Sequence, residues 1–181
     1  MKWLALLLAL ASFAAHANED LWTLVAGGGQ VLFVRHSHTT PGVGDPVGFK
    51  LEDCATQRNL SADGRAQSQR LGAEFRRRGI PLGELLSSPW CRCLDTAQLA
   101  FGPAKAWPAL SNLFGRHGAA ERQLRALRPR IAAYRGKANL VLVSHGSTAA
   151  ALTGEHPAMG EVLVLTPAGK DFRVAGRISV P

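Results

Sequence analysis

The sequence predicts an α/β protein in which helices cover both faces of a mostly parallel central sheet, a three-layer α/β/α arrangement. Two observations predict it. Short, wholly apolar runs of the kind that buried parallel strands require recur along the chain. Segments with apolar residues at helical spacing alternate with these runs. Residues 18–181 are long enough to bury one core, so we expect a single domain there.

Residues 1–17 are predicted to be a signal peptide and not part of the fold. A basic residue, Lys2, precedes an apolar run over 4–15, and the segment ends in the Ala-His-Ala pattern that signal peptidases accept. The run is short for a membrane anchor, which needs about 20 apolar residues. We therefore expect cleavage after Ala17, a periplasmic or secreted protein, and no stable membrane insertion afterwards.

The first half of the domain is predicted to contain a strand over 31–34 and a helix that begins after Ser61 and ends near Arg78. The strand is wholly apolar, and Ser61 can cap the helix. Gly79 is typical of the position just past a helix end. Between these two elements, residues 39–59 form a loop rich in glycine and proline that is longer than a simple connection requires.

The second half is predicted to continue the alternation. A short strand over 84–87 leads into a helix opened by Ser88 and Pro89, with the proline at the first helical position. A helix over 118–134 should be kinked at Pro129. The further predicted elements are a strand over 140–143, a short helix from near Ser147, and final strands over 162–166 and 172–178 that include an antiparallel edge.

Two histidines and two arginines are predicted to meet at one edge of the sheet. His36 follows the strand over 31–34, and His145 follows the strand over 140–143. Arg35 precedes the first histidine, and Arg92 comes just after another strand. Ligands of open parallel sheets bind at the carboxyl ends of the strands. Each residue alone has an ordinary explanation, but their common placement favours a shared pocket.

This set of residues suits phosphoryl transfer. A transferring phosphoryl group spreads negative charge over three oxygens, which planar guanidinium groups match with paired donors. Neighbouring arginines also disfavour imidazolium, which leaves a histidine nitrogen able to attack phosphorus. The formal net charge of +8 suits anionic ligands. Nucleic acid is not expected as a partner, because the arginines are scattered and no nucleic-acid motif is visible.

The chain resembles the histidine phosphatase superfamily, which includes the cofactor-dependent phosphoglycerate mutases. The family pattern Arg-His-Gly-x-Thr is matched in LFVRHSHTT by Arg35, His36 and Thr39. The pattern Ser-x-x-x-Arg-x-x-x-Thr-Ala is matched in SSPWCRCLDTAQLAF by Arg92 and Thr96. Two further matching blocks, in the family's order, are NLSADGRAQSQRLG and LVLVSHGS.

The resemblance implies a phosphoglycerate mutase-like fold and a phosphatase, a phosphoric monoester hydrolase that requires neither metal nor other cofactor. His36 would accept the phosphoryl group, Arg35, Arg92 and His145 would bind it together with Thr39, and water would hydrolyse the phosphohistidine. TGEHPAMGEVLVL is similar to exported bacterial relatives of a lipopolysaccharide core heptose-phosphate phosphatase. The resemblance therefore implies a small-molecule or glycolipid phosphate ester of the envelope as substrate.

The sequence departs from the family pattern at two points. Ser37 replaces the glycine after the nucleophile and adds a side chain there. Many members also use a glutamate between the second arginine and the second histidine as proton donor, where this chain offers only Glu121. Glu161 is the other candidate, with Glu155 behind it, and the identity of the acid stays open.

Three cysteines, Cys54, Cys91 and Cys93, predict one disulfide and one free thiol in an oxidising compartment. Cys54 is expected to pair with one of the other two, and the sequence does not decide which. A zinc site is the rival interpretation, but it needs a fourth ligand.

Two other classes of function are considered. His36 and His38 are two residues apart and, with His145, are able to bind one metal ion in a metal-dependent hydrolase, although two arginines nearby oppose a cation. A phosphate-binding module of the same fold without catalysis is the third possibility. His117 and His156 have no partner pattern and are interpreted as surface residues.

Overall fold

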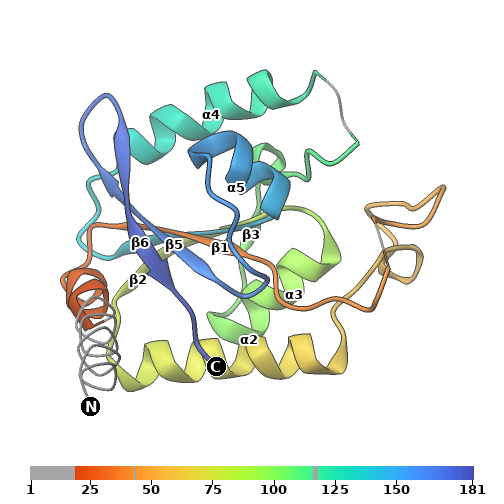
Figure 1. Cartoon of the computed structure of the whole chain (residues 1–181), viewed down its shortest axis with the longest axis horizontal. Helices are drawn as coiled ribbons and strands as arrows, with labels where there is room; N and C mark the ends of the chain where they lie inside the picture. Colours follow the sequence, from red (N-terminus) through yellow and green to blue (C-terminus); the bar gives the residue numbers. More distant parts are fainter. Residues whose placement is uncertain (1–18, 43, 116–117) are drawn as a thin grey trace, which may run out of the picture.

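A computed structural model describes residues 19–42, 44–115 and 118–181, so the predicted signal peptide lies outside the described residues (Figure 1). A six-stranded sheet in the order β3-β2-β4-β1-β5-β6 forms its centre. The strands are β1 (Val31–Arg35), β2 (Leu82–Ser87), β3 (Lys105–Ala106), β4 (Asn139–Ser144), β5 (Val162–Pro167) and β6 (Phe172–Ile178). The pairs β1–β4, β2–β4 and β2–β3 are parallel, whereas β5 and β6 add an antiparallel edge, as predicted.

Helices cover both faces of this sheet, which confirms the predicted three-layer fold (Figure 1). The helices α2 (Ala62–Arg77) and α3 (Cys91–Ala100) lie on one face, and α4 (Ala120–Ala132) and α5 (Gly146–Thr153) lie on the other. Residues 19–26 form a further helix that packs in the layer of α2 and α3. Two short 3-10 helices, η1 (Cys54–Thr56) and η2 (Pro108–Leu110), complete the elements.

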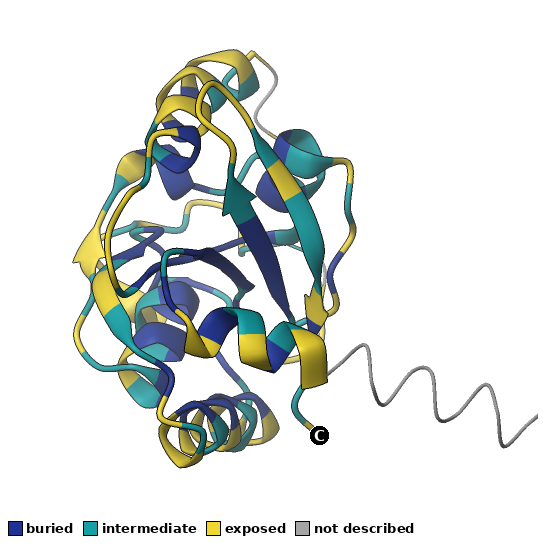
Figure 2. Cartoon of the chain, turned by 90° about the vertical axis from the view of Figure 1, so that its left-hand side faces the viewer, coloured by how far each residue is buried: buried dark blue, intermediate teal, exposed yellow. Residues whose placement is uncertain are grey.

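The central strands are apolar throughout because both of their faces are buried. In β1, Leu32 and Val34 belong to the core under α2 and α3, whereas Val31 and Phe33 belong to the core under α4 and α5. All four side chains are fully buried, and the strands at the centre of the sheet are largely dark blue in Figure 2. Alternation along a strand sends successive side chains to opposite faces, so a strand between two helical layers needs an unbroken apolar run.

The ends of the helices follow the predicted signals with one exception. The Ser61 hydroxyl caps α2 by accepting a hydrogen bond from Gly64 N at 3.1 Å, and Gly79 follows the helix with a φ of 63°. The prediction that Pro89 begins α3 is wrong, because the helix starts at Cys91. Ser88 N instead donates to Val143 O of β4 at 2.8 Å, which keeps the chain extended past the end of β2.

Among the described residues, no helix combines the length and the apolar character that crossing a bilayer requires.

Candidate active site

The candidate site lies where β1, β2 and β4 end side by side. His36 follows β1 and donates its backbone N–H to Ser144 O, the last residue of β4, at 2.9 Å. His145 comes next in the chain, and the two imidazole centroids are 5.3 Å apart. The parallel register therefore places both histidines at one sheet edge, because strands that run in the same direction end on the same side.

A cavity of about 400 Å³ opens at this edge. The four residues predicted to carry the chemistry, Arg35, His36, Arg92 and His145, all contribute to its lining. Additional lining side chains that the sequence analysis did not single out for the pocket are those of Arg58, Asn112, Phe114, Ser147 and His156. The site is thus a basic cavity lined by three guanidinium groups and by the imidazoles of His36, His145 and His156.

His36 is held as a neutral imidazole with one free ring nitrogen. Its Nδ1 lies 2.9 Å from the Ser37 carbonyl oxygen, which only accepts hydrogen bonds, so Nδ1 carries the proton and Nε2 carries the lone pair. Burial, reinforced by the charges of Arg92 and Arg35, lowers the pKa of His36 to about 3. The unprotonated Nε2 is the form that a nucleophile requires.

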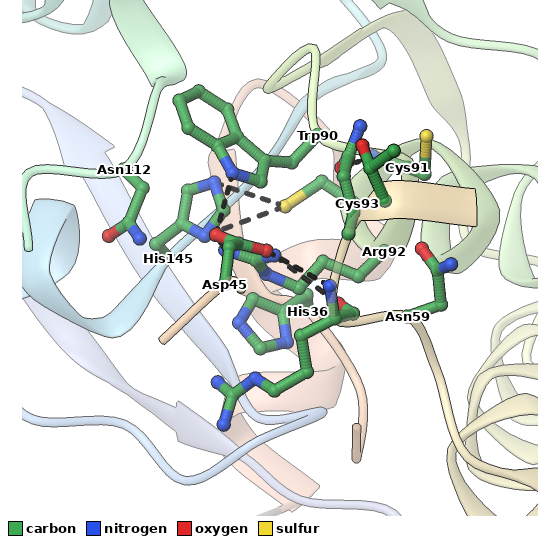
Figure 3. Close-up of polar contacts among 12 residues, drawn as sticks. His36, Asp45, Asn59, Trp90, Cys91, Arg92, Cys93, Asn112 and His145 are labelled. Atoms are coloured by element: carbon green, nitrogen blue, oxygen red, sulfur yellow. Dashed lines mark hydrogen bonds and ion pairs between the residues drawn. The ribbon is translucent and has the colours of Figure 1, made fainter. Parts of the chain in front are cut away.

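His145 is fixed by three neighbours on the side of β2 and α3 (Figure 3). Its Nε2 lies 2.8 Å from the Ser88 hydroxyl and 3.5 Å from Cys93 Sγ, and the Trp90 ring packs edge-on at 5.4 Å between centroids. Burial, and then the charges of His36 and Arg92, hold the pKa of His145 well below its usual range. These contacts orient its ring within the cavity.

Arg92 projects from the first turn of α3 and is paired with Asp45, a residue of the long loop (Figure 3). Nη1 donates to Asp45 Oδ1 at 2.6 Å and Nη2 to Oδ2 at 3.2 Å. The carboxylate also accepts from Trp90 Nε1 at 3.0 Å and from Arg58 N at 3.1 Å. Burial opposes its ionisation, but the hydrogen bonds and charge of Arg92 outweigh burial and lower the pKa of Asp45.

Arg35 reaches the cavity along the first turn of α5. Its Nη1 donates to Pro157 O at 2.8 Å. A Cβ on Gly146 would lie 3.1 Å from Arg35 Nε, so the glycine after the second histidine leaves room for the guanidinium group. This close approach gives a steric reason for the His-Gly pair at the end of β4.

The disulfide joins Cys54 to Cys91, which decides between the two pairings that the sequence left open. Cys93 is the buried free thiol, and burial raises its pKa to about 12. Cys91 is the residue before Arg92. The disulfide therefore ties the long loop to the turn of α3 that carries this arginine.

Asp45 and Arg58 are two charged residues of the long loop that sequence reasoning missed in the site. Both lie in the loop whose unusual length was noticed, but no spacing in the sequence connects them with Arg92. Arg92 Nη1 donates to Arg58 O at 3.3 Å and to Asp45. Only the folded path of the loop shows that Arg58 lines the cavity and that Asp45 pairs with Arg92 beside it.

Ser37 and Thr39 lie beside the cavity and do not line it. The Ser37 hydroxyl is fully buried and lies 2.7 Å from Ser68 Oγ of α2, while Ser37 N donates to Thr96 Oγ1 at 3.0 Å. The extra side chain thus packs against helices and not against a bound phosphoryl group. Thr39 forms an isolated β-bridge with Leu60. Its predicted role in substrate binding stays a prediction.

The glutamates considered as proton donors lie away from the cavity lining. Glu121 is exposed on α4, where it pairs with Arg125. Glu161 accepts hydrogen bonds from Ala158 N and Ser179 Oγ, both at 2.8 Å. Glu155 pairs with Arg177. In the part of the chain that the structure describes, no carboxylate is placed for protonating a leaving group from within the cavity.

His38, the third ligand of the metal hypothesis, is exposed and does not line the cavity with His36 and His145. Its backbone N–H bonds to Gln67 Oε1 at 3.1 Å. Across residues 19–42, 44–115 and 118–181, no three histidine, cysteine or acidic side chains are grouped in a way that would hold a metal ion.

Solved structures with the same fold include several phosphatases. They include the protein histidine phosphatase SixA bound to tungstate (TM-score 0.54, 21% identity, covering 83% of this chain and 96% of that chain). A phosphoserine phosphatase variant from Entamoeba histolytica has a TM-score of 0.58 at 12% identity, with 82% and 95% covered. A mycobacterial glucosyl-3-phosphoglycerate phosphatase has a TM-score of 0.58 at 16% identity, with 80% and 96% covered. At these identities the likeness establishes a shared fold.

No curated protein matches the chain by sequence. The family model of the histidine phosphatase superfamily (branch 1) matches residues 31–116, the stretch from β1 through α3 that carries Arg35, His36 and Arg92. This match, together with the shared fold, makes the protein a phosphatase. The chain belongs to the histidine phosphatase superfamily.

Proposed function

We propose that this phosphatase hydrolyses phosphate monoesters through a phosphohistidine on Nε2 of His36. The observation that carries the proposal is the pairing of His36 Nδ1 with Ser37 O, which leaves Nε2 unprotonated in a cavity lined by three guanidinium groups. Positive charge in a buried setting stabilises the oxygens of a transferring phosphoryl group. The contacts of His36 therefore support a nucleophilic role.

The proposed reaction has two displacement steps. In the first, the bond from Nε2 of His36 to phosphorus forms while the bond from phosphorus to the ester oxygen breaks, and this oxygen takes a proton from solvent and leaves as an alcohol. In the second, water attacks phosphorus, the bond to Nε2 breaks, and inorganic phosphate and a proton leave. The guanidinium groups of Arg35 and Arg92 and the ring of His145 hold the phosphoryl oxygens through both steps.

We propose a phosphorylated envelope sugar, free or as part of a glycolipid such as lipopolysaccharide, as the substrate. Asn112 and Ser147 contribute polar groups to the cavity, and Phe114 contributes a ring that is 63% exposed. An amide, a hydroxyl and an aromatic face suit a polyhydroxylated leaving group. The Entamoeba and mycobacterial neighbours are phosphatases of phosphoserine and of a glucosyl phosphoglycerate, and the latter is itself a sugar derivative.

We also propose that the protein acts in the periplasm or outside the cell. The predicted signal peptide supports this location, and so does the disulfide between Cys54 and Cys91, because disulfides persist in oxidising compartments.

The experiment that tests the catalytic proposal is hydrolysis of p-nitrophenyl phosphate, whose leaving group departs without prior protonation. We expect turnover by the wild type with or without chelator, and loss of turnover in His36→Ala by about three orders of magnitude or more. His38→Ala is the matched control, because His38 is exposed and two residues away. Rapid quenching with ³²P-labelled substrate should trap an acid-labile label on the wild type only.

Two outcomes would point to the other classes of function. Activity that is lost with chelator and in His38→Ala would support the metal-dependent hydrolase. Phosphate binding with no turnover and no labelled protein, for any substrate tested, would support a binding module without catalysis.

A further inference from the structure

Three guanidinium groups in the cavity share one pattern of hydrogen bonds. Arg35 donates through Nη1 to Pro157 O, Arg92 through Nη1 to Asp45, and Arg58 through Nη1 to Gly42 O. In each of the three the Nε atom is buried and has no hydrogen-bond partner among the described residues. A buried donor without a partner is costly, and it is a group that a ligand can satisfy.

The unpartnered Nε defines the edge of each guanidinium group that is available to a ligand. Nε–H and the neighbouring Nη2–H point in the same direction and match two oxygens of an oxyanion. In Arg92, Asp45 takes one hydrogen of Nη1 and one of Nη2, so Nε–H and the second hydrogen of Nη2 form the edge left for a phosphoryl group. Arg58 lines the same cavity with the same edge unpartnered.

The backbone of Arg58 is tied to the first turn of α3 by several contacts. Gln57 Oε1 accepts a hydrogen bond from Cys91 N at 3.0 Å, and Cys91 also forms the disulfide with Cys54. Arg58 N donates to Asp45, and Arg58 O accepts from Arg92. The backbone of Arg58 is therefore fixed beside Arg92. Because this backbone is already ordered, less entropy is lost when the Arg58 side chain binds a ligand.

The charge of Arg58 is not matched by a carboxylate in direct contact. Among the described residues, its side chain takes part in no ion pair, whereas Arg92 has Asp45. Burial, and then the charge of Arg92, lowers the pKa of Arg58. A phosphoryl dianion in the cavity would relieve both penalties, because it supplies the missing acceptor and offsets the like charges.

We propose that Arg58 is a third phosphoryl-binding arginine, which bonds phosphoryl oxygens through its Nε edge beside Arg35 and Arg92. This inference rests on the proposed function, since it assumes that the cavity binds the phosphoryl group of a substrate. It assigns part of the recognition of phosphate to the long loop, outside the motifs that carry the family resemblance.

The test is the affinity for inorganic phosphate, measured by isothermal titration calorimetry at pH 7 with the full-length mature protein. We expect Arg58→Gln to weaken phosphate binding about tenfold or more, and Arg58→Lys to weaken it less, because lysine keeps the charge without the paired donors. Arg65→Gln is the matched control, since Arg65 is an exposed arginine of α2 paired with Asp95. It should leave phosphate affinity unchanged.

Phosphate affinity in Arg58→Gln equal to that of the wild type, with an unchanged melting temperature and an intact disulfide, would overturn the proposal. Equal weakening in Arg58→Gln and Arg65→Gln would also overturn it, because the effect would then come from net charge. If Arg58→Gln does not fold, Arg58→Lys decides, since it must bind phosphate more weakly than the wild type. Phosphate binding that depends on Arg58, without turnover by the wild type, would leave this inference standing and reject the catalytic one.

Discussion

At the scale of single residues, the site combines three arginine charges with one carboxylate, that of Asp45. Arg35, Arg58 and Arg92 face the cavity, while both histidines are kept neutral by burial. Asp45 is the carboxylate that this cluster contacts, and its side chain is only 5% exposed. It aligns Arg92 and leaves the Nε edge of that arginine for a ligand.

The Asp45→Asn variant should be strongly destabilised. Removing one partner of a buried ion pair leaves the other charge uncompensated, which costs about 3–5 kcal/mol. Asp95→Asn is the matched control, because the pair of Asp95 with Arg65 is about half exposed and should contribute less than about 1 kcal/mol. Urea denaturation of both variants measures the difference. Similar losses of stability in the two would show that the Asp45–Arg92 pair is not the tight buried contact described here.

At the scale of elements, the site is built from strand ends on one side and the long loop on the other. The parallel strands β1, β2 and β4 place His36, Ser88 and His145. The loop over 39–59 contributes Asp45 and Arg58, and it is attached to α3 by the disulfide. The rigid sheet thus positions the proposed nucleophile, and the disulfide positions the loop.

Removing the disulfide with the double variant Cys54→Ser, Cys91→Ser should cost both stability and phosphate affinity. A bridge across a sequence separation of 37 residues contributes about 4 kcal/mol through loop-closure entropy. Loosening the loop also frees Arg58 from Arg92, so phosphate should bind more weakly. Thermal unfolding and calorimetry check the two effects.

Reduction of the wild type with dithiothreitol should reproduce the behaviour of that variant. In the untreated native protein, a thiol reagent should find no reactive group, because Cys93 is buried. One reactive thiol should appear after unfolding without reductant, and three after unfolding with it. Activity and stability that do not respond to reduction would contradict the assigned role of the disulfide.

At the scale of the whole molecule, two cores stabilise a fold that holds two buried, neutral histidines at the ends of its central strands. The strands β1, β4 and β5 are buried on both faces, between α2 and α3 on one side and α4 and α5 on the other (Figure 2). His36 and His145 are 4% and 2% exposed. Protonating either of them in the folded state is unfavourable, so the stability of the whole fold depends on pH.

We predict that the free energy of unfolding falls as the pH drops below about 6.5. The pKa of His36 is about 3 in the folded protein and near 6.5 in an unfolded chain, so the unfolded state binds more protons in this window. Stability is therefore highest above pH 6.5 and is lost toward pH 3, by up to about 1.4 kcal/mol per pH unit for each buried histidine.

The measurement is urea denaturation of the wild type and His36→Gln between pH 7 and pH 4. The free energy of unfolding of His36→Gln should fall less steeply with decreasing pH, because its unfolding takes up about one proton fewer. The exposed control His38→Gln should follow the wild type. Parallel curves for wild type and His36→Gln would mean that His36 titrates normally in the folded protein.

Much of the fold and of the placement of the candidate site residues was predictable because short-range patterns encode it. Apolar runs mark strands that are buried on both faces, as in 31–34, and Ser61 and Gly79 mark the ends of a helix. His36 and His145 follow such strands, and the geometry of parallel strands then brings them to one edge. Prediction was weaker where a local signal competed with a contact across the fold. Pro89 is a good first residue for a helix, but the hydrogen bond from Ser88 to β4 keeps the chain extended there, and α3 begins only at Cys91.

The sequence alone thus determined the order of the elements, the two histidines and the arginines Arg35 and Arg92, and it left the partner of Cys54 open. Only the tertiary structure decided that Cys91 is this partner and that Asp45 and Arg58 belong to the site. The physical reason is that a long loop has no repeating pattern. Its path is set by contacts made across the fold, such as those with Trp90 and Arg92, and such contacts leave no periodic signal in the sequence.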